Sequence, residues 1–317
     1  MTNHTVGVDI SKARLDAHEH APTGSRTASF SNDAAGFRKL IAWVGPGVGR
    51  VAYEPTGPWH RDFEEVLLKA GLPLYAINPY QVRCFARSQG RRAKIDAVDA
   101  RTLAVMAAAI DDLRPTPAKS RSQRDLAELQ SVRDALVADR TAPLNRGKHL
   151  RHALAKRINK ERLAQIERQL KSVDDEIQRL LQSEETLRRR SRILTSIPGI
   201  SSVTAAGLIV HMPELGTLTG PRAASLAGLA PVTRESGAWR GRSFIQGGGH
   251  TVRRTLYMPA LSAIRWNPDL KRKYAALLDA GKPPKVALTA VMRKLVVLAN
   301  ALLQQDRLRT PEPRAAN

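Results

Sequence analysis

The stretch HTVGVDISKARLDAHEHAPTGSRTASFS, residues 4–31, contains three short runs. Apolar and polar residues alternate within each run, and polar turns separate the runs. Alternation with a period of two is typical of β-strands. We therefore expect strands at residues 6–10, 14–18 and 27–30, joined as a meander. Asp9 stands in the middle of the first strand, where an ionised side chain is unfavourable unless something positive compensates it.

The chain after this meander alternates between helical and strand patterns. Asn32 or Asp33 can cap a helix that carries apolar residues from 37 to 44, and strands follow at 50–54 and 74–77, with helices at 58–70, from Pro79 and at 95–110. The order βββαβαβα is that of an RNase H-like sheet, although other α/β folds share parts of it.

The remaining chain reads as mainly helical. Pro115 and Pro117 open a linker, and the segment from 124 to 190 is charged and helical. Within it, apolar residues recur at alternating spacings of three and four and form a seam: Leu163, Ile166, Leu170, Val173, Ile177 and Leu180. Such a seam favours either a helical hairpin within one chain or an oligomerisation coiled coil. We expect an α/β domain at 1–115, a helical linker or coiled coil at 116–190, a mainly α domain at 191–305 and a disordered tail at 306–317. The turn at 195–200 resembles a helix-hairpin-helix motif, and 228–249 reads as a loop rich in Gly and Arg.

Composition points to a polyanionic partner. The 317 residues carry 51 Lys and Arg against 29 Asp and Glu, a formal net charge of +22, which favours nucleic acid or an anionic surface. Neither a membrane span nor a secretory signal is expected, and the single Cys84 excludes an internal disulfide framework. We therefore expect a cytoplasmic protein. Aromatic residues make up 4% of the chain, so phosphate contacts are favoured over base stacking.

Four carboxylates are candidates for a metal site. Asp9 lies in a strand, Glu54 ends another strand, and Asp96 and Asp99 stand three apart at the start of a helix. Each has an ordinary structural explanation, such as a favourable interaction with a helix dipole. Together, within so basic a chain, they favour a two-metal Mg²⁺ site for phosphodiester chemistry.

Basic residues surround these acids and recur further along the chain. We expect nucleic-acid contacts from three regions: beside the acids, in the middle helices and around a C-terminal loop. The candidates are Arg91, Arg92, Lys94, Arg146, Lys148, Arg151, Arg234, Arg240, Arg242, Arg253 and Arg254.

A serine in the C-terminal loop is a candidate nucleophile. Ser236 lies between Arg234 and Arg240, with Ser243 as a competitor. A serine hydroxyl needs a base, a metal or strong electrostatic help to attack, and no histidine has a spacing that marks it as the base. From the residues alone, a hydrogen-bonding serine in a phosphate-binding loop is the favoured interpretation.

Eight sequence blocks, taken together, are similar to those of a known family. The blocks VGVDISK (6–12), YEPTG (53–57) and KIDAVDA (94–100) resemble those of the DEDD insertion-sequence transposases, the insertion-sequence one-ten family. The blocks IPGI (197–200), LAGLAP (226–231), RESG (234–237), RRTLYM (253–258) and GKPPK (281–285) resemble that family's carboxy-terminal domain. The resemblance runs from about residue 5 to 303, in the family's order.

The resemblance implies more than the residues alone. It implies a RuvC-like amino-terminal domain whose tetrad Asp9, Glu54, Asp96 and Asp99 binds Mg²⁺. It also implies that Ser236 attacks a DNA phosphate to form a phosphoserine. This reverses the interpretation from the residues alone, which favoured a serine that only hydrogen-bonds to phosphate. The resemblance further implies a structured bridge RNA as a partner and an active site that combines domains of different protomers in a tetramer.

The sequence therefore predicts a transposase that exchanges DNA strands, with a structured RNA and further copies of the chain as partners, in a nucleoid-associated prokaryotic setting. Two alternatives remain open at this point. One is a metal-dependent junction nuclease in which Ser236 only binds, and the other is a non-catalytic basic scaffold for nucleic acid.

Overall fold

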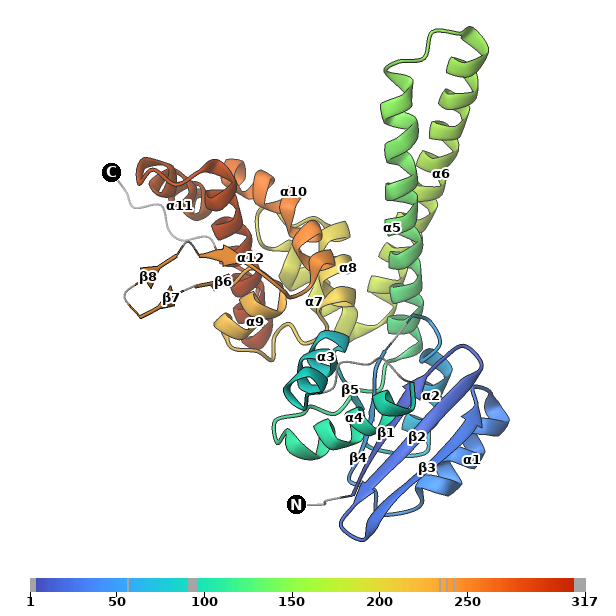
Figure 1. The fold of residues 1–317 in the computed structure, drawn as a ribbon. Helices are drawn as coiled ribbons and strands as arrows, with labels where there is room; N and C mark the ends of the chain where they lie inside the picture. Colours follow the sequence, from blue (N-terminus) through green and yellow to red (C-terminus); the bar gives the residue numbers. More distant parts are fainter. Residues whose placement is uncertain are drawn as a thin grey trace. The chain divides into compact units, whose positions relative to one another are not determined.

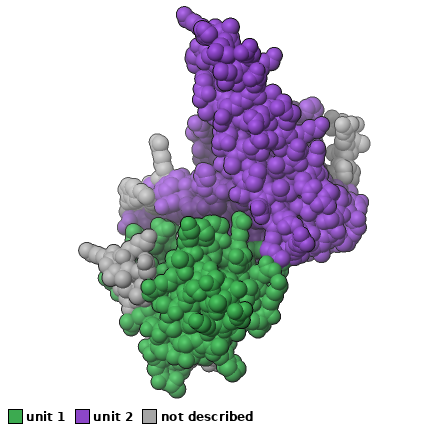
Figure 2. Space-filling model, turned by 90° about the vertical axis from the view of Figure 1, so that its right-hand side faces the viewer, with its two compact units in different colours: residues 1–119 green, residues 120–317 purple. Residues whose placement is uncertain are grey.

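The computed structural model describes residues 4–55, 57–90, 96–233, 235–237, 239–241 and 243–310, with the side chains of residues 96–98, 239 and 240 left outside the description. The chain forms two compact units, residues 1–119 and 120–317, which Figure 2 colours separately.

The first unit is built around a mixed five-stranded sheet. Its strands are β1 (Thr5–Ile10), β2 (Arg14–Ala21), β3 (Gly24–Ser31), β4 (Arg50–Tyr53) and β5 (Leu74–Ala76). They lie in the order β3-β2-β1-β4-β5, antiparallel on the meander side and parallel from β1 through β4 to β5. The expected meander and α/β pattern are thus confirmed.

Helices cover both faces of this sheet (Figure 1). They are α1 (Ala34–Val44), α2 (Arg61–Lys69), α3 (Pro79–Ser88) and α4 (Asp96–Ala109). Asp33, one of the two expected caps, accepts a hydrogen bond from the backbone N–H of Gly36 at the start of α1. Val6, Val8 and Ile10 of β1 pack into the core on the α1 and α2 side, so the residues between them face α4.

The second unit is mostly helical. A long pair, α5 (Arg121–Gly147) and α6 (Ala153–Ser183), is followed by α7 (Glu185–Thr195), α8 (Ser202–His211), α9 (Gly220–Leu226), α10 (His250–Trp266), α11 (Pro268–Asp279) and α12 (Pro284–Gln304). Helices α7 to α12 lie together (Figure 1), and their buried apolar residues form a large core that Leu126 of α5 and Ile177 of α6 also join. A mainly α carboxy-terminal region is therefore confirmed.

Helices α5 and α6 lie side by side as a hairpin within one chain (Figure 1). Four of the six seam residues are buried: Ile166, Leu170, Ile177 and Leu180. Two ion pairs cross the hairpin, Arg133 with Asp174 at 2.6 Å and Arg140 with Glu167 at 3.2 Å. The structure thus shows the hairpin, while a contribution of the seam to oligomerisation stays a prediction.

The turn at 195–200 connects α7 to α8, and its glycine is explained by packing. Gly199 has a φ of +104°, and a Cβ there would lie 2.9 Å from the carbonyl oxygen of Pro259 in α10. Ile197 and Ile200 are buried in the core beside it.

Helix α12 is the one helix among the described residues that is long and apolar enough to cross a membrane by length and composition. Half of its most apolar window is buried inside the second unit, where Val291, Leu295 and Val296 join the core. Core helices of globular proteins meet the same criterion.

Candidate active site

Helix α4 is fixed across one face of the sheet by contacts along β1. The Thr5 hydroxyl donates to the carbonyl oxygen of Ala104 at 2.9 Å. A Cβ at Gly7 would lie 2.0 Å from the carbonyl oxygen of Ala100, so the helix and strand backbones touch at that point. At the far end of the helix, Arg50 donates to the carbonyl oxygen of Ala107. Successive residues of β1 therefore contact successively earlier residues of α4, because Thr5 contacts Ala104 and Gly7 contacts Ala100.

Asp9 and Glu54 lie at the carboxyl ends of adjacent parallel strands. The strand register pairs Val8 with Tyr53, so Asp9 is the next residue of β1 and Glu54 directly follows β4. Asp9 shares a face with Gly7, and Glu54 shares one with Ala52, which packs with Leu103 of α4. Both acids therefore lie on the side of the sheet that α4 covers, and both are half-buried.

Asp96 and Asp99 occupy the first turn of α4. Because Ala104 lies by Thr5 and Ala100 by Gly7, the start of α4 is directed toward the strand ends that carry Asp9 and Glu54. In the described part of the chain, no group of three or more His, Cys, Asp or Glu side chains is close enough to hold a metal ion. The Asp96 side chain is outside that description.

A buried polar network underlies the end of β4 and was missed by sequence reasoning. The Tyr53 hydroxyl donates to Glu64 at 3.0 Å, and Lys119 donates to the same carboxylate at 3.0 Å. Burial and the adjacent Glu64 charge raise the pKa of Tyr53 well above its ordinary value, so its hydroxyl stays protonated. The network holds the residue that precedes Glu54. Its signal in the sequence was a carboxylate at an otherwise apolar position of α2, between Phe63 and Leu67.

The expected loop at 228–249 is largely a β-hairpin, which we call the β-arm (residues 231–245). Strand β6 (Pro231–Val232) pairs with β9 (Phe244–Ile245), and β7 (Glu235–Ser236) pairs with β8 (Trp239–Arg240). Sequence reasoning read a loop because Gly and Arg dominate the segment and each strand is only two residues long. Ser236 lies exposed beside the turn, where Gly237 adopts a φ of +56°. Figure 1 shows the β-arm extending from the helices of its unit.

The base of the β-arm is held by Arg253 and by a close backbone crossing. The Arg253 guanidinium donates to the carbonyl oxygens of Gly228 and Gly247. A Cβ at Gly248 would lie 2.4 Å from the Cα of Gly228, so only glycine fits this crossing. These glycines therefore allow two segments of the chain to approach each other, and Arg253 connects α10 to the β-arm.

The other expected basic contacts fall into three groups. Arg91, Arg92, Lys94, Arg234 and Arg242 lie outside the described residues, as does the side chain of Arg240. Arg146, Lys148 and Arg151 are exposed where α5 turns into α6. Arg254 is exposed but donates to Asp134 of α5 at 3.0 Å.

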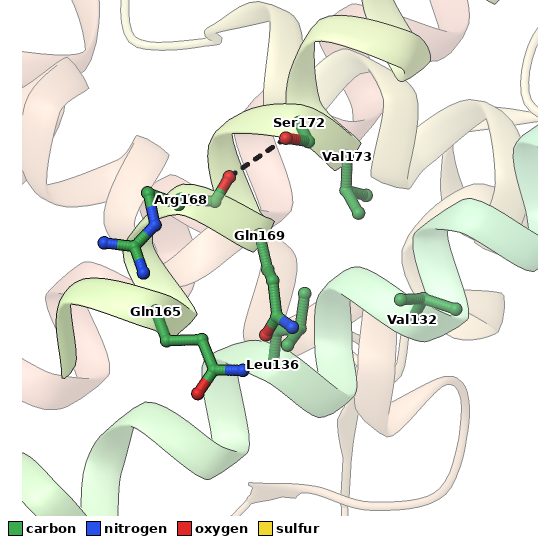
Figure 3. A pocket seen from close by; sticks show the side chains of 7 residues that line it. All are labelled: Val132, Leu136, Gln165, Arg168, Gln169, Ser172 and Val173. Atoms are coloured by element: carbon green, nitrogen blue, oxygen red, sulfur yellow. Dashed lines mark hydrogen bonds between the residues drawn. The ribbon is translucent and has the colours of Figure 1, made fainter. Parts of the chain in front are cut away.

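A groove of about 390 Å³ lies on the α5–α6 hairpin (Figure 3). Val132, Leu136 and Val173 contribute its apolar lining, and Gln165 and Gln169 contribute amides. None of the expected catalytic residues lines it. The groove is a feature of the hairpin surface.

Two family models match the chain. One, described as a transposase of the DEDD, IS110 type, matches residues 6–159, and the other, described as the transposase IS116/IS110/IS902 family, matches residues 191–275. The pilin gene-inverting protein of Moraxella bovis is 25% identical over 97% of this chain and 98% of its own length. An uncharacterized 43.6 kDa protein of the insertion element IS110 from Streptomyces coelicolor is 30% identical over 45% of this chain and 35% of its own.

Among solved structures, the RuvC protein of T. thermophilus in complex with a Holliday junction substrate aligns with 36% of this chain and 99% of its own, at 15% identity and a TM-score of 0.29. The family matches and the full-length relatives define a DNA transposase and recombinase, which is an enzyme. The chain belongs to the IS116/IS110/IS902 family of transposases.

Proposed function

We propose that the chain cleaves and exchanges the DNA strands of an insertion element through a phosphoserine at Ser236, assisted by Mg²⁺ held by Asp9, Glu54, Asp96 and Asp99. The observation that supports the proposal most is that Asp9 and Glu54 end adjacent parallel strands, and that the amino end of α4, the helix to which Asp96 and Asp99 belong, is directed toward those strand ends. All four acids lie inside one matched family range and Ser236 lies inside the other.

The acids fit a divalent cation by their donor chemistry. Carboxylate oxygens are the ligands that Mg²⁺ prefers, and two of these acids end neighbouring parallel strands. A bound Mg²⁺ would polarise the phosphate and stabilise the oxygen that leaves it. The Tyr53–Glu64–Lys119 network would keep the end of β4 in place while Glu54 acts.

The serine step is a phosphoryl transfer. The Ser236 oxygen forms a bond to phosphorus as the bond from phosphorus to one strand oxygen breaks, and the serine proton leaves to solvent or to a base. The released strand oxygen takes up a proton. In the second half, a hydroxyl of the incoming strand attacks the phosphoserine and regenerates the serine. The exposed position of Ser236 beside the turn of the β-arm suits a nucleophile that must reach a duplex.

The proposal also includes two kinds of partner, a structured RNA and further copies of the chain. A structured RNA would bind the exposed basic tip of the hairpin, where Arg146, Lys148 and Arg151 lie. Two or four copies would associate, bringing the β-arm of one protomer to the acids of another, in the nucleoid. The apolar lining of the hairpin groove supports contact between copies, because half-exposed apolar side chains on a helix pair gain by burial.

Strand-exchange assays on acid variants test the metal half of the proposal. Asp9→Asn and Glu54→Gln should abolish exchange of element-end DNA, since each loses a charged ligand, while Asp62→Asn, on the exposed face of α2, should not. Thermal unfolding of each variant controls for folding. Full exchange by Asp9→Asn and Glu54→Gln would contradict the proposal.

A further inference from the structure

The loops that follow β1 and β4 are joined to each other at the end of the sheet where Asp9 and Glu54 lie. The side-chain amide of Asn32 donates to the carbonyl oxygen of Ser11, after β1, at 2.8 Å. The same amide donates to the carbonyl oxygen of Trp59, in the loop after β4, at 3.1 Å. Asn32 therefore fixes the two loops relative to each other beside the candidate acids.

Lys12 lies in the first of these loops, with its ammonium group near an exposed aromatic ring. Its Nζ is 5.5 Å from the centroid of the Trp59 ring, within the range of a cation–π interaction. The Lys12 side chain is exposed, and Trp59 is 43% exposed. The backbone N–H of Asn32 also donates to the carbonyl oxygen of Ala13 at 3.0 Å, so the backbone on both sides of Lys12 is held. A fixed loop thus presents this cation to solvent.

The acids next to these two loops in the chain, apart from the candidate metal ligands, have structural roles. Asp16 accepts a hydrogen bond from Arg14 at 2.8 Å, and Asp33 caps α1. Asp62 is exposed in the first turn of α2, where a negative charge interacts favourably with the helix dipole. Among the described residues, Lys12 has no carboxylate as an ion-pair partner. Its charge is therefore available to an anion that comes from outside the chain.

The position of Lys12 indicates which anion this is. Lys12 is three residues after Asp9, a length of chain that spans at most about 11 Å. DNA bound at the acids carries a negative charge on every phosphate, and Mg²⁺ at the acids would serve the phosphate that is cleaved. The phosphates beside it need other cations, and lysine binds phosphate as a point charge. A lysine that only balanced the acids would instead pair with one of them.

We propose that Lys12 contacts a backbone phosphate of the DNA strand held at the acids, next to the phosphate that is cleaved. Trp59 is its positioning residue, because the ring holds the ammonium group beside the strand ends before DNA arrives. The inference rests on the proposed function, since the acids determine where the cleaved phosphate lies. It adds a residue that positions the substrate on the RuvC-like unit itself.

Binding of a duplex that contains the cleavage site tests the contact, measured on the full chain carrying Ser236→Ala so that no serine adduct forms. Lys12→Met should weaken binding roughly ten-fold, the size expected for one lost contact between charged groups. Lys12→Arg should retain most of the affinity because it keeps the charge. Lys39→Met is the matched control, since it removes an exposed lysine from α1, which packs on the opposite face of the sheet, and it should have no effect.

Neutral phosphates identify the contact itself. The phosphates on either side of the cleavage site are replaced, one at a time, by a methylphosphonate, which carries no charge. At one of these positions the replacement should weaken binding roughly ten-fold when Lys12 is present and have no further effect in Lys12→Met. Trp59→Ala should weaken binding about two- to five-fold when Lys12 is present and not in Lys12→Met, and Trp59→Phe should retain most of the affinity because it keeps a ring.

Methylphosphonates that act equally with and without Lys12 would overturn the inference, as would a Lys12→Met variant that binds like Lys39→Met. A loss in Trp59→Ala that persists in Lys12→Met would show that the ring acts on the fold and does not position Lys12. Thermal unfolding of each variant controls for folding. Failure of the proposed function appears separately, as the absence of a Ser236 adduct in the chain that retains its serine, and the methylphosphonate comparison does not depend on that adduct.

Discussion

At the scale of single residues, Gly7 shows how a backbone contact positions the acids. A Cβ at this position would lie 2.0 Å from the carbonyl oxygen of Ala100 and 2.5 Å from the backbone nitrogen of Ala104. Both neighbours are backbone atoms of α4 and cannot turn aside as a side chain would. The glycine therefore permits α4 to lie directly on β1, with its amino end directed toward the end of the strand that carries Asp9.

Gly7→Ala should push α4 away from the sheet. We expect the free energy of unfolding to fall by about 1–3 kcal/mol, the usual cost of overpacking, and strand exchange to fall further than stability alone explains. Chemical denaturation and an exchange assay on the same preparation measure both. Gly220→Ala is the matched control, because its Cβ would meet only the Val297 side chain, at 3.2 Å. A Gly7→Ala variant with normal stability and exchange would show that the close contact is unimportant.

The sequence indicates the acids and the serine by different kinds of evidence, a local pattern for Asp9 and a family resemblance for Ser236. Asp9 was marked by its place in an apolar strand, and the pairing of β1 with β4 then brings Glu54 beside it, which no local pattern could show. Glu64 was missed because one carboxylate within an amphipathic helix looks like an ordinary surface residue until its partners, Tyr53 and Lys119, are known. Ser236 was identified by resemblance, since its neighbours alone favoured simple phosphate binding.

At the scale of elements, the α5–α6 hairpin shows that one periodic sequence pattern is compatible with two structures, a hairpin within one chain and a coiled coil between chains. A heptad seam specifies that apolar residues meet another helix, but it does not specify which chain supplies that helix. Here α5 supplies it, and Ile177 is 1% exposed in the resulting core. The β-arm is the opposite case, because strands of two residues leave no periodicity to detect.

Ile177→Ala should destabilise the second unit by about 2–4 kcal/mol, since it leaves a cavity in a core that is otherwise filled. Leu154→Ala, at a position in the same helix that is 47% exposed, should change stability far less. Denaturant unfolding of the two variants compares them directly. Equal effects would mean that the hairpin core is not packed as described.

At the scale of the whole molecule, buried histidines make stability depend on pH. Burial lowers the pKa of His18, His60 and His211, and in the last two it outweighs the nearby carboxylates Glu64 and Asp134. The unfolded chain then binds more protons than the folded chain below a pH of about 6.5, the ordinary pKa of histidine. Stability should therefore be fully present above that pH and should decline as the pH falls below it.

Denaturant unfolding across that pH range measures the effect. His211→Gln should flatten the decline, whereas His152→Gln, which replaces an exposed histidine, should leave it unchanged. Stability that rises on mild acidification would contradict the assigned direction of these pKa shifts.

The formal net charge of +22 is also a property of the whole molecule, and it affects how the protein binds nucleic acid. Binding of DNA or RNA should weaken steeply with salt, because each phosphate contact releases counterions. Lys148→Ala and Arg151→Ala, at the tip of the hairpin, should each reduce the slope of log affinity against log salt by about one. A titration that hardly depends on salt would exclude the tip as a phosphate-binding surface.

The central claim is that Ser236 becomes covalently joined to DNA, and adduct trapping tests it most directly. The protein is incubated with Mg²⁺ and a nicked suicide substrate, and any protein–DNA adduct is digested and located by mass spectrometry. The account predicts a phosphodiester on Ser236, absent in Ser236→Ala and retained in Ser243→Ala. Strand cleavage without an adduct, or an adduct that persists in Ser236→Ala, would contradict it and would favour a nuclease in which the acids alone perform the cleavage.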